Sequence, residues 1–323
     1  MKKIKVAING FGRIGRAFFK VAKEKEEVEI IAINELGSKE NMEYLLKYDT
    51  VYGASSYDLK NVKYLSEKDP TKLPWKDLDI DVVVESTGLF ASSEKAQAHI
   101  DAGAKRVVIS APIKDGETIL MGINEEKLKN CIISSNASCT TNAGSPILAI
   151  LDETIGIEKA LLNTIHAYTA SQSLIDSPSK KDLREGRSAG QNIVPSSTGA
   201  AIAVTKAYPS LEGKFDGISI RVPVAIGSIV DITFISKKNT TAEEVNEILR
   251  GTSMAPRWTN IFSITEEPLV SSDIIGNSYA SIADLSFTRV VGGNLVKILA
   301  WYDNEMGYAH TLVRHVIETG KYI

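Results

Sequence analysis

The sequence contains few cysteines, no long apolar run and no excess of positive charge, and each absence excludes a class of protein. Two cysteines in 323 residues, Cys131 and Cys139, do not make a disulfide framework and indicate a reducing compartment. No segment approaches the roughly 20 apolar residues of a membrane helix. The basic stretch after Met1 precedes no apolar region long enough for a signal peptide. We therefore expect a cytoplasmic protein without a membrane partner.

The charge and the length limit the function and the architecture further. The formal net charge of −3 argues against a general nucleic-acid binder, because phosphate backbones call for a basic face. We accordingly expect no nucleic-acid partner, and we expect no bound metal. The chain has 323 residues, which is more than a domain with a single hydrophobic core usually contains, so two domains are predicted.

Short strands and helices are predicted to alternate through the first part of the chain. The strand candidates are residues 4–8, 28–33, 81–85 and 106–110, and the helix candidates are residues 16–25 and 93–102. Strands that alternate with helices imply a parallel sheet with helices on both faces. This half is therefore predicted to be a Rossmann-type, doubly wound α/β domain.

The pattern changes after residue 160 to longer β-rich runs with few helices between them. The strand candidates there are residues 160–166, 217–223, 228–236 and 295–302. They predict an α+β catalytic domain with a mostly antiparallel or mixed sheet. We place the first domain at residues 1–138, with a C-terminal helix at 305–323 packing back onto it, and the second at 139–304. Residues 177–197, rich in Gly, Ser and Lys, are predicted to form a long ordered loop.

A glycine-rich turn follows the first predicted strand and opens the first helix. In Gly10-Phe11-Gly12-Arg13-Ile14-Gly15 the glycines would allow a tight turn, close approach to a pyrophosphate and helix–strand packing. Glu35 follows the second strand, where an acid can accept hydrogen bonds from ribose hydroxyls and repel a 2′-phosphate. A plain glycine turn and a solvated loop acid are the alternatives. The order of strand, turn, helix, strand and acid favours a dinucleotide site for NAD.

The segment Ser138-Cys139-Thr140-Thr141-Asn142 precedes a helix predicted from near Asn142, through Pro146, towards Glu153. Unpaired N–H groups and partial positive charge at a helix N-terminus favour a thiolate, the form of cysteine that attacks a carbonyl carbon. Cys139 is therefore a candidate covalent catalyst. The alternative is a buried cysteine that acts as a small hydrophobic residue.

A thiolate needs a base or a cation beside it, and histidine is the usual partner. We expect His99 in a surface helix and His310 and His315 in the C-terminal helix. By elimination His166, at the end of a strand, is the best candidate, although a structural histidine is the alternative. Arg221 and the segment 197–201 offer the guanidinium, hydroxyls and N–H groups that an anionic phosphate requires.

These segments, in this order, closely resemble the phosphorylating glyceraldehyde-3-phosphate dehydrogenases over nearly the whole chain. The segments that carry the resemblance are INGFGRIGR (8–16), KYD (47–49), ESTG (85–88), SAP (110–112), SNASCTTN (135–142), HAYT (166–169), PSSTGAA (195–201), RVP (221–223) and WYDNE (301–305). The resemblance implies that Cys139 attacks the substrate aldehyde and forms a thiohemiacetal. His166 would take the hydroxyl proton as hydride moves to NAD, and inorganic phosphate would release an acyl phosphate from the thioester. The Cys139 N–H and His166 would stabilise the oxyanion.

The resemblance also assigns binding residues and an assembly. The residues implied in cofactor binding are Asn9, Gly10, Phe11, Gly12, Arg13, Ile14, Glu35, Lys68, Thr87, Ser110, Asn304 and Tyr308. The residues implied for the substrate phosphate are Thr169, Arg184 and Arg221, and those for the attacking phosphate are Ser138, Thr140, Thr198 and Gly199. A homotetramer is implied, with the 177–197 loop at subunit contacts.

The sequence departs from the family's pattern at a few positions. Glu35 stands where NAD-using members usually have aspartate, whereas Pro178 keeps a proline found in members that prefer NAD. Ala143 replaces a common second cysteine, which removes one route to oxidation. Met306 replaces an aromatic residue and is expected to soften local packing. A related erythrose-4-phosphate dehydrogenase and an RNA-binding or scaffolding protein remain the alternative functions.

Overall fold

The computed structural model describes residues 3–179 and 182–323, and the chain divides into two compact units. Unit 1 comprises Met1–Ser138 and Ala309–Ile323, and unit 2 comprises Cys139–Tyr308. No helix in the described parts of the chain is long and apolar enough to cross a membrane.

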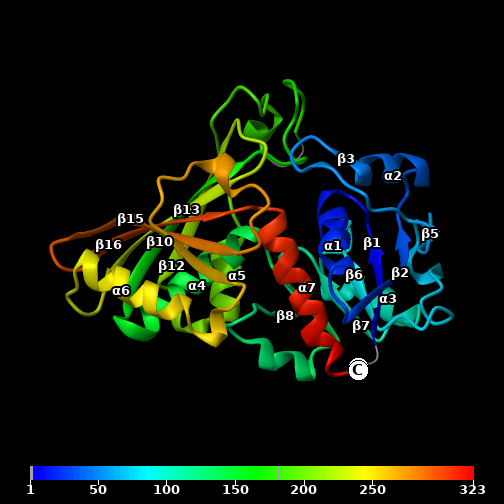
Figure 1. Cartoon of the computed structure of the whole chain (residues 1–323), viewed down its shortest axis with the longest axis horizontal. Coiled ribbons are helices and arrows are strands. Elements are labelled where there is room, and N and C mark those ends of the chain that lie inside the picture. Colours follow the sequence, from blue (N-terminus) through cyan, green and yellow to red (C-terminus); the bar gives the residue numbers. More distant parts are fainter. Residues whose placement is uncertain (1–2, 180–181) are drawn as a thin grey trace. The chain divides into compact units, whose positions relative to one another are not determined.

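Unit 1 is built on a parallel sheet of seven strands (Figure 1). Their order is β5 (Lys63–Leu65), β2 (Val28–Asn34), β1 (Ile4–Asn9), β6 (Val82–Glu85), β7 (Arg106–Ile109), β9 (Ile133–Ser135) and β8 (Glu117–Thr118). The helices of this part of the chain are α1 (Arg13–Lys23), α2 (Lys39–Lys47), α3 (Ser93–Asp101) and α7 (Met306–Gly320), and β3 (Tyr48–Asp49) pairs with β4 (Gly53–Ala54). The predicted Rossmann-type fold is confirmed. The strand order reverses between β1 and β6, and this switch point is where such sheets bind ligands.

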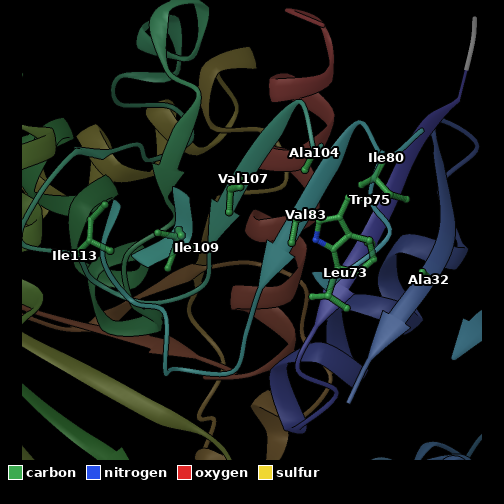
Figure 2. Packing of buried hydrophobic residues seen from close by; sticks show 11 residues of the cluster. Ala32, Leu73, Trp75, Ile80, Val83, Ala104, Val107, Ile109 and Ile113 are labelled. Carbon is green, nitrogen blue, oxygen red and sulfur yellow. The ribbon is translucent and has the colours of Figure 1, made fainter. Parts of the chain in front are cut away.

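The core of unit 1 contains a buried cluster around Trp75 (Figure 2). Trp75 is fully buried and belongs to the same cluster as buried Leu73, Ile80 and Val83. Its indole N–H donates to His99 Nδ1 across 3.1 Å, and His99 is also fully buried. Helix α3 has an exposed face, as predicted for a surface helix, but His99 lies on its buried face. Ala96 and His99 are the buried residues of α3, and their spacing of three places both on the helix face that packs inward.

Unit 2 is built on a sheet of seven strands (Figure 1). The sheet is mixed, in agreement with the predicted antiparallel or mixed sheet. The order of the strands is β11 (Val194–Ser197), β12 (Phe215–Val222), β10 (Ile157–Ala167), β13 (Ser228–Ser236), β16 (Leu295–Tyr302), β15 (Ser281–Val291) and β14 (Phe262–Thr265). The β10–β12 and β14–β15 pairs are parallel, and the others are antiparallel. The predicted 177–197 loop holds a short 3-10 turn, Leu183–Gly186, and ends in β11; residues 180–181 lie outside the described residues.

The two faces of this sheet differ. Helices α4 (Cys139–Thr154), α5 (Ala200–Ala207) and α6 (Ala242–Ser253) pack against one face. Along β13 the burial alternates strictly between buried and half-buried residues, as expected for a sheet covered on one side only. Leu161, Ile218 and Leu295 point away from the helices and are exposed. The second face is therefore an apolar surface that none of the described residues of unit 2 covers.

Candidate active site

The glycine turn of unit 1 borders a cavity of about 290 Å³ at the carboxyl ends of β1, β2 and β6. Gly10 adopts φ +94°, which only glycine tolerates easily, and its N–H donates to Asn34 O across 2.9 Å. Six of the predicted cofactor residues line the cavity: Asn9, Gly10, Gly12, Glu35, Lys68 and Thr87. The lining also includes residues that sequence reasoning missed: Asn34, Leu36, Glu67, Pro70, Ser86, Leu89 and Phe90.

Glu35 is held in place by backbone donors. Its Oε2 accepts from Phe11 N at 2.8 Å, and its Oε1 accepts from Gly37 N at 3.1 Å. The carboxylate thereby ties the end of β2 to the glycine turn while it borders the cavity. The Phe11 ring is fully buried, edge-on to Phe19, so this side chain serves the packing of the turn.

The other predicted cofactor residues lie in different places. Arg13 forms an ion pair with Asp49 at 3.2 Å, and backbone N–H groups together with Arg13 lower the pKa of Asp49 against the opposing effect of its burial. Ile14 is half-buried in α1. Ser110 follows β7, and its backbone N–H donates a hydrogen bond to Glu85 O. Asn304 and Tyr308 belong to unit 2.

A buried carboxylate lies behind the cavity lining. Glu85 is 1% exposed and accepts from Asn9 Nδ2 (2.5 Å) and from the Thr87 N–H (2.8 Å) and hydroxyl (2.5 Å). Because Trp75 can only donate, His99 Nδ1 accepts, and His99 Nε2–H donates to Glu85 across 3.1 Å. This network fixes Asn9 and Thr87, two residues of the lining. Sequence reasoning used the Glu85 segment only as a landmark.

The predicted nucleophile follows a strained turn. Ala137 adopts φ +55°, an uncommon value for a residue with a Cβ, and such outliers cluster at functional sites. Helix α4 then begins at Cys139 itself, three residues before the predicted start near Asn142. Backbone N–H groups of Cys139 and Thr140 consequently lie at the sulfur.

Cys139 and His166 are brought together by α4 and β10. The distance from Cys139 Sγ to His166 Nε2 is 3.3 Å, which is within hydrogen-bonding reach for sulfur. The ring of Tyr302 meets the imidazole edge-on, with centroids 5.9 Å apart, and limits its orientation. Tyr302 was not predicted as a site residue, and its position one residue before the Asp-Asn-Glu segment was the available signal.

Burial controls the ionisation of both groups. It raises the pKa of the Cys139 thiol, against the opposing effects of the Arg221 charge and the helix N–H groups. The net direction is opposite to the one predicted from the helix N-terminus alone. Burial, followed by the Arg221 charge, lowers the pKa of His166 to about 3. The pair is therefore a neutral thiol beside a neutral imidazole, and the imidazole is able to accept a proton.

Arg221 completes this cluster from the neighbouring strand. It lies opposite His166 in the parallel β10–β12 register. Its Nη1 lies 2.6 Å from His166 Nδ1 and 3.2 Å from Ala167 O. The Nε of this half-buried side chain has no hydrogen-bond partner within the described part of the chain. A donor without a partner beside a nucleophile suits an anionic ligand.

The other residues predicted to bind phosphate lie in several separate segments of the chain. Gly199 precedes α5, and the Thr198 hydroxyl accepts from Ala200 N at 3.2 Å. The Thr140 hydroxyl contacts Tyr302 Oη at 3.0 Å. Thr169 Oγ1 lies 3.0 Å from Ser171 Oγ, and half-buried Ser138 directly precedes the nucleophile. Arg184 is exposed and donates through Nε and Nη2 to Asp182, so it binds a carboxylate on its own loop.

Asn304 is buried with a fixed amide orientation. Its Oδ1 accepts from Gly227 N (3.2 Å) and from the Ser228 hydroxyl (3.1 Å). The Ser228 oxygen in turn accepts from Ala167 N, the residue after His166. Asn304 is thereby linked to the strand that carries His166. Ser228 gave no signal in the sequence.

Alanine substitution of Gly10 is expected to lower the stability of unit 1, whereas alanine substitution of Gly12 is expected to weaken ligand binding. A Cβ on Gly10 would lie 2.7 Å from Thr87 N at φ +94°, so Gly10→Ala should destabilise unit 1 by about 1–3 kcal/mol. A Cβ on Gly12 would meet nothing within 4 Å, so Gly12→Ala should unfold normally. It should weaken dinucleotide binding, because the sequence predicts that the pyrophosphate approaches the backbone there. Denaturant unfolding and titration with the dinucleotide measure both effects. Equal unfolding midpoints for the two variants would contradict this assignment.

Comparisons with known proteins relate both units to one family. Sequence profiles described as "Glyceraldehyde 3-phosphate dehydrogenase, NAD binding domain" and "C-terminal domain" match residues 4–93 and 138–304. The glyceraldehyde-3-phosphate dehydrogenase of Chlamydia muridarum is 46% identical, covering 96% of this chain and 97% of the relative. Glyceraldehyde-3-phosphate dehydrogenase 2 of Bacillus subtilis is 44% identical over 97% of each chain. The glyceraldehyde-3-phosphate dehydrogenase of Borreliella burgdorferi is 46% identical, covering 96% of this chain and 98% of the relative.

Proposed function

This chain belongs to the glyceraldehyde-3-phosphate dehydrogenase family, and we propose that Cys139 and His166 serve as the nucleophile and the proton carrier of its reaction. That reaction is the reversible, NAD-dependent oxidative phosphorylation of glyceraldehyde 3-phosphate to 1,3-bisphosphoglycerate, a step of glycolysis and gluconeogenesis. The assignment of roles depends on one observation, the 3.3 Å contact between the thiol and a neutral imidazole.

The first step forms a covalent bond to the substrate. His166 Nε2 takes the thiol proton, Cys139 attacks the aldehyde carbon, and the proton is returned to the new oxyanion, which gives a thiohemiacetal. The Cys139 N–H at the start of α4 and the His166 ring stabilise the negative oxygen while it exists. Because burial lowers the pKa of His166 to about 3, the resting ring is neutral across the neutral pH range and has one nitrogen lone pair that can take this proton.

The later steps use the same proton carrier. His166 takes the thiohemiacetal hydroxyl proton, and a thioester remains on Cys139. NAD supplies the acceptor for the hydride that leaves the same carbon. Inorganic phosphate then attacks the thioester and gives the acyl phosphate. The departing Cys139 thiolate takes the proton from His166, and the proton of the attacking phosphate is released to water, so that the protein returns to its starting state.

We propose that two sets of groups hold the two phosphates. The substrate phosphate is assigned to Thr169, Arg184 and Arg221, and the attacking phosphate to Ser138, Thr140, Thr198 and Gly199. Two observations support this assignment: Arg221 Nε has no hydrogen-bond partner among the described residues, and Gly199 provides no side-chain cap for the N-terminus of α5. Arg184 must exchange its Asp182 partner for the phosphate, and this exposed ion pair is weak enough to allow that.

The cavity of unit 1 suits NAD. The open space over Gly12 accommodates a pyrophosphate, and the Glu35 carboxylate at the same cavity suits ribose hydroxyls and repels a 2′-phosphate. We propose that Asn9, Gly10, Phe11, Gly12, Arg13, Ile14, Glu35, Lys68, Thr87, Ser110, Asn304 and Tyr308 form the cofactor site. Within it, Phe11 acts through its backbone N–H, which donates to Glu35, and Arg13 forms an ion pair with Asp49.

A coupled assay tests the proposed function. NADH formation should need glyceraldehyde 3-phosphate, NAD and inorganic phosphate together, and omission of any one should abolish steady turnover. The specificity constant for NADP should be lower than that for NAD. Turnover without phosphate would exclude the phosphorylating mechanism. A higher specificity constant for erythrose 4-phosphate would favour that related dehydrogenase.

We further propose a cytoplasmic homotetramer. The two cysteines are free, as expected in a reducing compartment. Two separate apolar surfaces support assembly: the uncovered face of the unit 2 sheet, and the loop that carries exposed Leu183 and Ile193. Leu161→Asp on the sheet face should lower the mass measured by light scattering. Met254→Asp, an exposed apolar position after α6, should leave that mass unchanged. The same mass for both variants would exclude the sheet face as an interface.

A further inference from the structure

His315 in α7 is a fully buried side chain of unit 1 that the reaction steps above do not use. Its Nδ1 lies 3.1 Å from Asn136 Oδ1, and its Nε2 lies 2.8 Å from the Ser134 hydroxyl. An amide oxygen can only accept, so Nδ1 carries the proton and donates, and Nε2 accepts from Ser134. Burial lowers the pKa of His315 to about 3, so the ring is neutral, as one donor and one acceptor require.

The same helix also binds the nitrogen of the Asn136 amide. Asn136 Nδ2 donates to the Thr311 hydroxyl across 3.2 Å, so α7 binds both polar atoms of this fully buried side chain. Thr311 and His315 are one turn of helix apart and therefore lie on the same face of α7. The Asn136 backbone is held by the sheet, because its N–H donates to Ile109 O at the end of β7 across 3.0 Å. Asn136 is thereby fixed by α7 and by the sheet together.

Asn136 directly precedes the strained turn before the predicted nucleophile. Ala137 adopts φ +55°, and α4 begins at Cys139, two residues later. A left-handed conformation at a residue with a Cβ is unfavourable by itself and persists only where the surrounding structure enforces it. The bound amide of Asn136 fixes the chain on one side of Ala137, and the Ala137 N–H donates to the Ser135 hydroxyl across 2.9 Å. The direction in which the chain leaves this turn sets the position of the first residue of α4.

We propose that His315 and Thr311 are positioning residues that hold the turn at Ala137 through Asn136 and thereby place Cys139 for attack on the substrate. This inference rests on the proposed function, in which Cys139 is the nucleophile. Their effect reaches the sulfur through the Asn136 amide and the backbone of residues 136–139. Without them, Ala137 would relax towards negative φ, and the sulfur would leave the position at which it lies 3.3 Å from His166 Nε2.

A purely structural role for these hydrogen bonds predicts a different result. Their loss would lower the stability of unit 1, but the enzyme that remains folded would keep its kcat. A displaced nucleophile instead lowers kcat and slows the single-turnover burst of NADH, because attack by Cys139 precedes hydride transfer. The dissociation constant for NAD should stay the same, since other residues line the cavity near Gly10. The division between kcat and binding therefore separates the two roles.

Two threonines of α7 allow the same substitution with and without loss of a contact to Asn136. Thr311→Val removes the hydroxyl that accepts from Asn136, whereas Thr319→Val removes a hydroxyl that donates to His315 O within the helix. Both side chains are buried, at 1% and 2% exposure. We expect Thr311→Val to lower kcat and the burst rate about tenfold at an unchanged dissociation constant for NAD. Thr319→Val should lower the unfolding midpoint by a similar amount and keep kcat.

Two further changes test whether the turn itself transmits the effect. His315→Leu removes both ring hydrogen bonds and should lower kcat about a hundredfold. His315→Asn retains an amide N–H where Nδ1 lies and should recover most of that loss. Ala137→Gly, added to His315→Leu, should also raise kcat again, because glycine adopts a positive φ without strain. General damage to the packing around α7 would not be repaired by removal of the Ala137 Cβ.

Thr311→Val keeps the proposal testable if His315→Leu does not fold. Equal kcat values for Thr311→Val and Thr319→Val, in a protein whose wild type forms NADH in a phosphate-dependent manner, would overturn the positioning role and leave the proposed function standing. Failure of Ala137→Gly to raise the kcat of His315→Leu would contradict the route through the turn. Absence of phosphate-dependent NADH formation by the wild type would instead overturn the function itself.

Discussion

Replacing Cys139 with serine is expected to lower kcat by at least about four orders of magnitude. Serine keeps the size and the hydrogen-bonding capacity of the side chain, so α4 and the contact with His166 should persist. A hydroxyl, however, ionises far less readily than a thiol, and it would form an ester in place of a thioester. Both attack on the aldehyde and release by phosphate would therefore be slow. Steady-state NADH formation and a single-turnover burst measure the loss.

Cys131→Ser is the matched control, because it makes the same change at the other cysteine. Cys131 is 8% exposed in unit 1, so this variant should lose some stability and retain kcat. NAD titration should give similar dissociation constants for both variants, since the cavity near Gly10 and Glu35 contains neither cysteine. Substantial turnover by Cys139→Ser would remove Cys139 from the role of nucleophile.

The sequence was a good guide wherever one local rule decided the structure. Buried β-branched runs specified β1, β6 and β13, and both ends of β13 were predicted to the residue. The glycine turn was predicted because φ +94° at Gly10 and the absence of a Cβ at Gly12 are requirements that only glycine meets well.

The errors arose where long-range packing decided the outcome. His99 lies in a short, polar helix segment and gave no sign that it would be fully buried, because its partners Trp75 and Glu85 are 24 and 14 residues away in sequence. The start of α4 was misplaced because the turn before it depends on a positive φ at Ala137, which no local sequence rule predicts. The pKa of Cys139 was predicted in the wrong direction because burial is a tertiary property that outweighs the helix terminus.

In the candidate site, too, local sequence rules predicted single residues, whereas long-range packing decided their contacts. Residue types and order were enough to nominate Cys139, His166 and Arg221 separately. Their contacts depend on β10 and β12 being parallel neighbours in a register that places His166 opposite Arg221. No local pattern specifies that register, because it follows from the packing of the whole sheet. The contacts of His166 Nδ1 with Arg221 Nη1 and Ala167 O therefore could not be predicted from the sequence.

Replacing His166 with asparagine is expected to lower kcat by about 10²–10⁴-fold and to change how the rate depends on pH. The amide keeps a polar group near the sulfur but cannot carry a proton. The thiolate must then form by loss of a proton to water, and burial raises the pKa of Cys139. The residual rate should consequently rise about tenfold per pH unit through the neutral range.

The wild-type enzyme should show a different dependence of kcat on pH, for a different reason. Burial lowers the pKa of His166 to about 3, so the neutral ring is available throughout the neutral range and no loss of rate is expected as pH falls through 6.5, where a free histidine titrates. Acid inactivation should begin only as the pH approaches the lowered value. His310→Asn, in α7 of unit 1, is the matched control and should keep the wild-type profile. If His166→Asn retained kcat within about tenfold and a flat profile, the proton would have to travel by another group, and the 3.3 Å contact would be structural.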